Sequence, residues 1–193
     1  DKDIHKMQTF KEQVGNRFTY TRIKGVEVME GTRKLKKGQL GCLRSHQLII
    51  EHAIKHNYRN ILIFEDDVIF KDSWENIKTT INYLQHLQPN LLYLGCSQHY
   101  KWSEIKIINN YYHTIQSYGS FAVMINESIF TELLNKYKQE TKPIDHYLIE
   151  YQTKNKPKCL VMYPNKVIAD VTTSNTGCKP RDQNKFAKRF RWY

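Results

Sequence analysis

Apolar residues recur along this chain at two spacings, one typical of helices and the other of buried strands. The helical spacing is clearest around LRSHQLIIEHAIKHN (43–57), where Leu40, Leu43, Ile50 and Ile54 fall on one helical face. The same spacing predicts helices over 3–14, over 43–57, from Asp72, from Asn126 and from Pro143. Short apolar runs predict strands over 61–64, 91–95, 105–108, 111–116, 121–125, 159–163 and 166–171, with an extended piece near 18–23.

The order of these elements predicts the fold class. Helices and strands alternate in the first half of the chain, as they do where crossover helices join parallel strands. The sequence therefore predicts an α/β fold with a mixed, mostly parallel central sheet flanked by helices. Neither repeats nor Pro/Gly-rich linkers interrupt the 193 residues, so we expect a single domain over 1–193.

Three adjacent carboxylates interrupt an otherwise apolar stretch, NILIFEDDVIFKDSW (60–74). In strand-like geometry Glu65 and Asp67 point to the same side and Asp66 to the other. Two carboxylates that share one face beside apolar walls repel each other, so either one is protonated or a cation lies between them. Oxygen ligands favour a hard ion, Mg²⁺ or Mn²⁺, which completes its shell with water and phosphate. A solvated acidic turn is the alternative, but apolar residues on both sides disfavour it.

The overall positive charge predicts an anionic binding partner. Lys and Arg number 30 against 19 Asp and Glu, a net charge of +11, so nucleic acid, a phosphorylated small molecule and an anionic surface are all open. The abundance of Lys, Asn, Ile and Tyr is typical of an AT-rich genome, which suggests a microbial or viral source. Four widely spaced cysteines without a CxxC pair do not predict a zinc site.

Localisation is open from sequence alone. No apolar run approaches the roughly 20 residues that cross a bilayer, and no signal peptide opens the chain. We therefore expect a soluble domain without a transmembrane segment, in either the secretory lumen or the cytoplasm.

Two linked motifs resemble glycosyltransferase family 25, which includes lipopolysaccharide-type sugar transferases and collagen galactosyltransferases. Gly41-Cys42 and Ser45-His46 open a helix in GQLGCLRSHQLIIEHAI, and about 20 residues later NILIFEDDVIF ends a strand in Glu-Asp-Asp. YGSFAVMINESIF (118–130) is similar to the family's glycine-led strand and helix, and PIDHYL (143–148) to its Pro-Val-Asp segment. The resemblance spans roughly residues 10 to 175.

The resemblance implies a GT-A fold, a UDP-sugar donor and a Mn²⁺ (or Mg²⁺) ion at a DxD-like motif. By position Glu65 and Asp67 are the implied metal ligands, and Asp66 either helps to hold the donor or only orients the turn. GT-A enzymes often have a late third metal ligand, for which Asp170 is the candidate here.

The implied reaction moves a hexose, galactose or glucose, to an acceptor hydroxyl with inversion. The acceptor is a glycan, a glycolipid or a collagen-like protein. Gly41, Ser45 and His46 then lie near the donor, and Asp145 is the candidate general base. Three of these residues have a structural alternative. His46 could be a hydrogen-bonded core histidine, Ser45 a partner of backbone groups, and Asp145 a carboxylate favoured in the first turn of a helix.

The chain also departs from the family pattern. It opens at DKDIHKMQTF, inside what resembles the family's next helix, so the first donor-binding strand is missing from this sequence. A degenerate transferase domain with a structural or partner-binding role is therefore an alternative. The basic tail, 179–193, ends in KFAKRFRWY, which is predicted to be a helix with its aromatics on the core. Besides the transferase and the degenerate domain, a nucleic-acid-binding module is the remaining alternative. No nucleic-acid-binding motif accompanies the tail, however.

Overall fold

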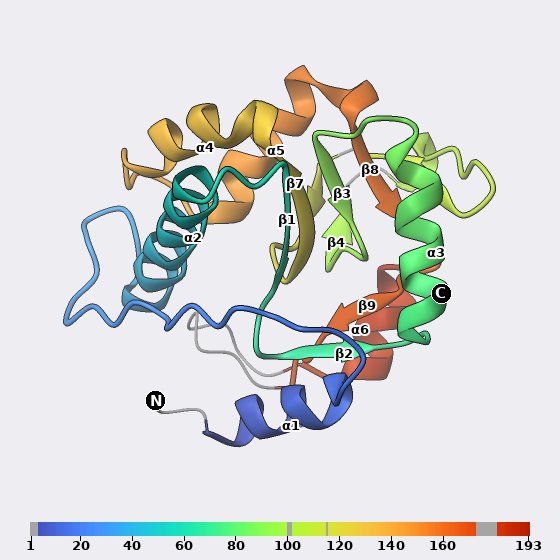
Figure 1. Ribbon diagram of the computed structural model, residues 1–193, viewed down its shortest axis with the longest axis horizontal. Coiled ribbons are helices and arrows are strands. Elements are labelled where there is room, and N and C mark those ends of the chain that lie inside the picture. Colours follow the sequence, from blue (N-terminus) through green and yellow to red (C-terminus); the bar gives the residue numbers. More distant parts are fainter. Residues whose placement is uncertain (1–3, 100–101, 115, 173–180) are drawn as a thin grey trace.

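A five-stranded mixed sheet lies at the centre of the computed structural model, which describes residues 4–99, 102–114, 116–172 and 181–193 (Figure 1). Its strands, in spatial order, are β1 (Asn60–Phe64), β7 (Ala122–Asn126), β3 (Leu91–Tyr93), β8 (Cys159–Met162) and β5 (Tyr111–His113). The α/β class and the mixed sheet are confirmed. Of the sheet's four strand pairs only β3–β8 is parallel, so the prediction of a mostly parallel sheet is wrong.

The error concerns which strands are neighbours. β1 and β3 are both antiparallel to β7, so they run in the same direction, as the helix between them predicts. β7 comes from later in the chain and inserts between them, which makes both contacts antiparallel. Short-range patterning determines the direction of a strand after a crossover, whereas its hydrogen-bonded neighbour is chosen by long-range packing.

Two short ladders complete the sheet structure of the described residues. They are β2 (Val68–Phe70) with β9 (Val167–Ala169), and β4 (Gln98–His99) with β6 (Ser117–Tyr118). The predicted strand at 105–108 contributes only a bridge from Ile108 to Tyr111, and the extended piece near 18–23 forms no strand. Position 3 of the first predicted helix, position 115 of a predicted strand and 179–180 of the tail lie outside the described residues.

Helices cover both faces of the central sheet (Figure 1). They are α1 (Ile4–Val14), α2 (Lys37–Lys55), α3 (Trp74–Gln85), α4 (Phe130–Tyr137), α5 (Ile144–Lys154) and α6 (Gln183–Arg189). Short 3₁₀ turns lie at Trp102–Glu104, Glu127–Ile129 and Lys156–Lys158. No helix in this part of the chain is both long enough and apolar enough to cross a membrane.

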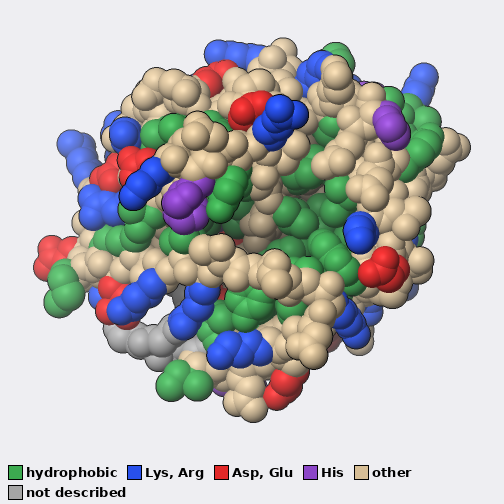
Figure 2. Space-filling model, viewed as in Figure 1, with side chains coloured by type: hydrophobic (Ala, Val, Ile, Leu, Met, Phe, Trp, Pro, Cys, Tyr) green, Lys and Arg blue, Asp and Glu red, His purple; other side chains and the backbone are tan. Residues whose placement is uncertain are grey.

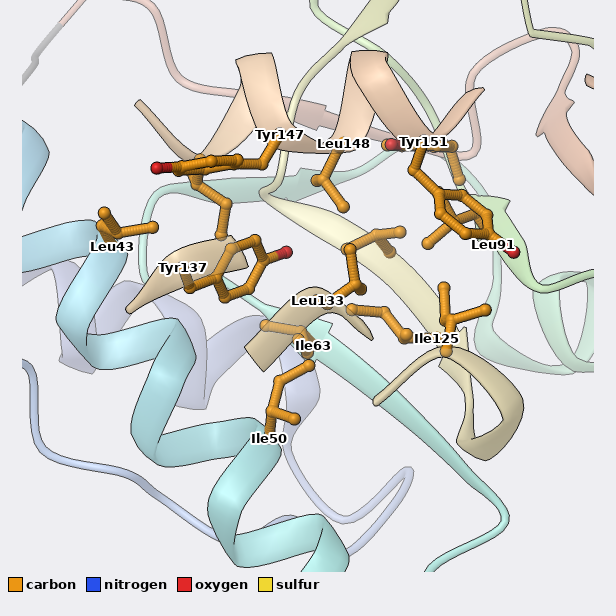
Figure 3. Packing of buried hydrophobic residues seen from close by; sticks show 14 of the residues in the cluster. Leu43, Ile50, Ile63, Leu91, Ile125, Leu133, Tyr137, Tyr147, Leu148 and Tyr151 are labelled. Atoms are coloured by element: carbon orange, nitrogen blue, oxygen red, sulfur yellow. The ribbon is translucent and has the colours of Figure 1, made fainter. Parts of the chain in front are cut away.

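The alternation of side chains along each strand divides the core in two. Leu91, Ile125 and Ile63 face α2, α4 and α5, where they pack with Leu43, Ile50, Leu133, Tyr137, Tyr147, Leu148 and Tyr151 (Figure 3). Leu92, Met124 and Leu160 face the opposite way, against the apolar sides of α1 and α3. The burial of both faces explains why the strands are apolar throughout.

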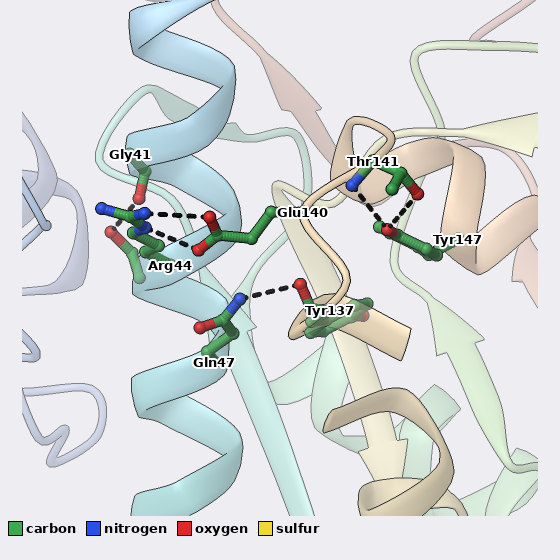
Figure 4. A network of polar contacts seen from close by, with 8 residues as sticks. Gly41, Arg44, Gln47, Tyr137, Glu140, Thr141 and Tyr147 are labelled. Carbon is green, nitrogen blue, oxygen red and sulfur yellow. Dashed lines mark hydrogen bonds and ion pairs between the residues drawn. The ribbon is translucent and has the colours of Figure 1, made fainter. Parts of the chain in front are cut away.

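Polar contacts fix α2 against the end of α4 and the loop that follows it (Figure 4). Arg44 donates from Nε and Nη2 to the two carboxylate oxygens of Glu140, at 2.6 and 2.9 Å. One turn later, Gln47 donates to the backbone carbonyl of Tyr137 at 2.9 Å. A bidentate pair restricts rotation as well as distance, so α2 presents its other face to the site in a defined orientation.

The basic tail forms α6, with its N-cap at Asp182. Phe186 and Trp192 are buried, and Trp192 donates from its indole nitrogen to the carbonyl of Ser97 at 2.9 Å. Lys185 and Lys188 are exposed. The predicted helix with its aromatics on the core is confirmed for the described part of the tail.

Candidate active site

The acidic triplet forms a turn between two sheets. Glu65 extends the β1–β7 pairing by one residue, because its N–H donates to the carbonyl of Phe121 at 2.9 Å. After the turn, β2 pairs with β9, and the N–H of Asp170 donates to the carbonyl of Asp67 at 2.7 Å. The chain therefore holds Glu65 at the end of one ladder, and Asp67 beside Asp170 at the end of the other.

The first turns of α2 carry the second motif to the same place. Ser45 donates from Oγ to the carbonyl of Gly41 at 2.8 Å and accepts from the N–H of Val26 at 2.9 Å. This hydroxyl therefore ties the irregular segment between α1 and α2 to the helix, which confirms its role as a partner of backbone groups. His46 is only 3% exposed, and its Nε2 lies 3.7 Å from Oε1 of Glu65.

Gly41 is part of the α2 helix, which begins at Lys37, earlier than predicted. A Cβ at Gly41 would lie 2.7 Å from the carbonyl oxygen of Val26, so the absence of a side chain allows this close approach. Helix and segment are in direct backbone contact here, and the segment forms one wall of the site.

Gly41→Ala should therefore destabilise the protein although alanine is the better helix former. The helical preference contributes about 1 kcal/mol in favour of alanine, whereas overpacking against a backbone atom costs about 1–3 kcal/mol. We expect a lower melting temperature in thermal unfolding. Gly25→Ala is the matched control, because a Cβ there would meet only Ser45 Oγ at 3.9 Å. An equal loss in both variants would contradict this explanation.

Asp145 comes from the first turn of α5. Its Oδ1 accepts a hydrogen bond from the N–H of Gly119 at 3.2 Å. Gly119 has φ +123°, a conformation that side chains rarely allow, and a Cβ there would lie 2.6 Å from the ring of Phe121. Burial and the charge of Glu65 raise the pKa of Asp145 to about 6, although Gly119 and His46 act in the opposite direction.

The pKa values of Glu65 and Asp67 are shifted in opposite directions. Burial raises the pKa of Glu65, but His46, a 2.6 Å hydrogen bond from Ser120 Oγ and the charge of Lys6 together bring it below its usual value. Burial and the charge of Glu65 raise the pKa of Asp67 to about 7. Without a cation, Glu65 is therefore ionised and Asp67 holds its proton close to neutral pH.

Asp67 also has an unsatisfied oxygen. Its Oδ1 is buried and has no hydrogen-bond partner among the described residues. An orphaned carboxylate oxygen with a raised pKa, beside an ionised glutamate and near Asp170, is a suitable environment for a hard divalent cation. The residues present therefore fit Mn²⁺ or Mg²⁺.

A cavity of about 1500 Å³ unites the predicted site residues. All eight of them line it: Gly41, Ser45, His46, Glu65, Asp66, Asp67, Asp145 and Asp170. Cationic side chains line the same cavity, namely Lys6, Arg22, Lys24, Lys36, Lys37 and Arg181. The cavity thus combines an acidic centre with surrounding positive charge, which suits an anionic ligand that carries a metal ion.

Two contributors to the site were missed by the sequence reasoning. Ser120 donates to Glu65, and Lys6 lowers the pKa of both Glu65 and Asp67. Ser120 lies within the quoted YGSF stretch, so its place before a strand that pairs with β1 was the available signal. Lys6 is one of many lysines in the chain, and no local pattern distinguishes it.

Comparison with known proteins identifies a family. The sequence model of glycosyltransferase family 25 (LPS biosynthesis protein) matches residues 21–156. Mouse "Inactive glycosyltransferase 25 family member 3" is 33% identical over 84 residues, which are 38% of this chain and 14% of the mouse protein. Its human counterpart is 32% identical over the same extent. The Haemophilus influenzae "Lipooligosaccharide biosynthesis protein lex-1" is 43% identical over 47 residues, 24% of this chain and 16% of that protein.

Each match covers only a small part of the relative's own length. The chain spans about a seventh of the mouse and human proteins and about a sixth of the Haemophilus protein.

Proposed function

Because the chain belongs to glycosyltransferase family 25, we propose that it transfers a hexose, galactose or glucose, from a UDP-sugar to an acceptor hydroxyl. The proposed reaction depends on Mn²⁺ (or Mg²⁺) and inverts the anomeric centre. The observation that carries the proposal is the convergence of Glu65, Asp67, Asp170 and Asp145 on one cavity lined with positive charge. The acceptor class is a glycan, a glycolipid or a collagen-like protein.

The metal would be held by Glu65, Asp67 and Asp170. Their oxygen-only donor set and the orphaned Oδ1 of Asp67 support this assignment. When bound, the ion would stabilise the negative charge of the diphosphate leaving group. Asp67 must release its proton to bind a cation, so metal affinity should rise as the pH rises toward 7.

The protein's own groups account for the remaining steps. Asp145 accepts the proton of the acceptor hydroxyl, and a base with a pKa of about 6 is well matched to work near neutral pH. The N–H of Gly119 orients its carboxylate. His46 and Ser120 keep Glu65 ionised. Lys6 and Lys24 supply positive charge along the cavity that receives the diphosphate.

An inactive transferase domain with a structural or partner-binding role is the second candidate. The observation in its favour is that the mouse and human relatives are named as inactive proteins. Nucleic-acid binding has no comparable support. Figure 2 shows the Lys and Arg side chains of one face spread among Asp and Glu side chains rather than gathered in one patch.

Thermal unfolding with a panel of nucleotide sugars distinguishes the two candidates. A ligand that binds only the folded state contributes about 2.7 kcal/mol at 100 times its dissociation constant, and each kcal/mol moves the melting temperature by roughly 2–4 °C at this size. We expect one UDP-sugar to raise the melting temperature with Mn²⁺ and not with EDTA. An unchanged melting temperature with every donor would favour the inactive domain.

A further inference from the structure

A second set of possible metal ligands lies beside the carboxylate pair. Cys42 and His46 are four residues apart on α2, and Glu65 directly follows strand β1. The sulfur of Cys42, a ring nitrogen of His46 and a carboxylate oxygen of Glu65 lie within 4.8 Å of one another. Residues at i and i+4 share a helix face, so the helix presents both ligands toward the same carboxylate.

The distances suit shared coordination better than direct hydrogen bonding. His46 Nε2 lies 3.7 Å from Glu65 Oε1, which is too long for a hydrogen bond. In a tetrahedral zinc site with bonds of about 2.0–2.3 Å, neighbouring ligand atoms are separated by roughly 3.3–3.8 Å. Small movements of side chains would therefore bring the three atoms around one ion.

The buried ring of His46 is incompletely hydrogen-bonded. Its side chain is almost wholly buried, yet its Nδ1 has no hydrogen-bond partner within the described part of the chain. A buried histidine normally pairs both nitrogens, because an unpaired polar group costs free energy. No hydrogen bond at Nδ1 therefore holds the ring in place, and Nε2, which faces Glu65, is the nitrogen positioned to bind an ion.

We propose that Cys42, His46 and Glu65 form a site for a thiophilic divalent cation of the zinc class. Sulfur and imidazole select such ions, whereas the oxygen-only set of Glu65, Asp67 and Asp170 selects Mn²⁺ or Mg²⁺. Three protein ligands and one open position are typical of a reactive or exchangeable zinc site. The inference does not depend on sugar transfer, so it stands or fails separately from the proposed function.

Because Glu65 belongs to both ligand sets, the two sites exclude each other. A zinc-class ion would withdraw Glu65 from the oxygen set and weaken Mn²⁺ binding. The wide spacing of the cysteines concealed this site in the sequence, since Glu65 joins the two helical ligands only through the fold. Burial and the charges of Glu65, Asp145 and Asp67 raise the pKa of the Cys42 thiol, so without an ion the group keeps its proton, and it would release that proton on binding a metal.

Cobalt is a spectroscopic probe for this site. We expect Co²⁺, added to the reduced protein without any donor, to give a thiolate charge-transfer band in the near ultraviolet that Zn²⁺ then abolishes. Cys42→Ser should lose the band and bind Zn²⁺ at least about tenfold more weakly, because even outer-shell changes cost 10–100-fold. Cys159→Ser and Asp67→Asn should both keep the band, because Cys159 lies on β8, outside the group of Cys42, His46 and Glu65.

Several results would overturn the proposal. They are the absence of a band in the unmodified chain, a band that persists in Cys42→Ser, and a band lost in Cys159→Ser. If Cys42→Ser fails to fold, alkylation of the unmodified chain provides the test. Zn²⁺ should slow the labelling of Cys42 by iodoacetamide, as measured by peptide mass spectrometry, and Mn²⁺ should not. Equal labelling with and without Zn²⁺ would also contradict the site.

Discussion

Asp67→Asn should abolish the Mn²⁺-dependent stabilisation by a UDP-sugar and the transfer that accompanies it. The asparagine keeps the size of the side chain but cannot supply a carboxylate to the cation. Changes to outer-shell partners alone weaken metal affinity by about 10–100-fold, so loss of a direct ligand should exceed about a hundredfold. Calorimetric titration of Mn²⁺ and the thermal shift with donor would measure the two losses.

Without metal, Asp67→Asn should instead raise the free energy of unfolding. The folded-state pKa of Asp67 is about 7, above its usual 3.8. Between these two values the folded chain holds a proton that the unfolded chain has released, so the free energy of unfolding falls as the pH rises through this range. Above pH 7 the full cost of the buried charge is present, and asparagine removes it. At pH 8 with EDTA the variant should be more stable, on the order of 1 kcal/mol, with a smaller advantage at pH 5.

Asp72→Asn is the matched control for both effects. Asp72 accepts from Lys166 at 2.7 Å, and this contact holds its pKa below the usual value. Replacement of the Asp72 carboxylate should leave Mn²⁺ binding intact without stabilising the metal-free protein. If Asp67→Asn bound Mn²⁺ as tightly as Asp72→Asn, the carboxylate turn would not be the metal site.

The local parts of the site could be predicted from the sequence because each motif is a short segment on one element. Gly41, Ser45 and His46 are candidates through the resemblance to the family's Gly-Cys…Ser-His segment, whereas the interruption of an apolar run itself points to Glu65 through Asp67. The structure places all of them in the lining of one cavity. Their chemical roles stay predictions, which the variants above are designed to test.

The long-range parts could not be predicted in the same way. The insertion of β7 between β1 and β3 depends on packing across the whole sheet, and it is this pairing that brings Ser120 to within 2.6 Å of Glu65. Likewise, Asp170 meets Asp67 only because β9 pairs with β2. Sequence periodicity predicts which side of a strand or helix is buried and, with the connections, the direction of a strand. It does not predict which strand will be its hydrogen-bonded neighbour.

Asp145→Asn should reduce the turnover of transfer by about 10²–10⁴-fold, the usual contribution of a general base. Donor binding should change little, because the proposed role of Asp145 concerns the acceptor proton. With a pKa of about 6, the carboxylate is ionised at pH 7.5 and protonated at pH 5. The rate of the unmodified protein should therefore fall as the pH drops below 6, about tenfold for each unit well below the pKa.

The pH–rate profile separates this role from a structural one. With Mn²⁺ kept saturating, so that protonation of Asp67 does not limit the rate, Asp145→Asn should remove the fall below pH 6 along with most of the rate. The thermal shift with donor and Mn²⁺ should stay within a factor of a few in apparent affinity. Glu150→Gln is the control on the same helix, since Glu150 pairs with Lys142 and does not line the cavity. It should keep both the rate and the profile. An Asp145→Asn variant that retained the fall below pH 6, or a Glu150→Gln variant equally slow, would assign the general base elsewhere.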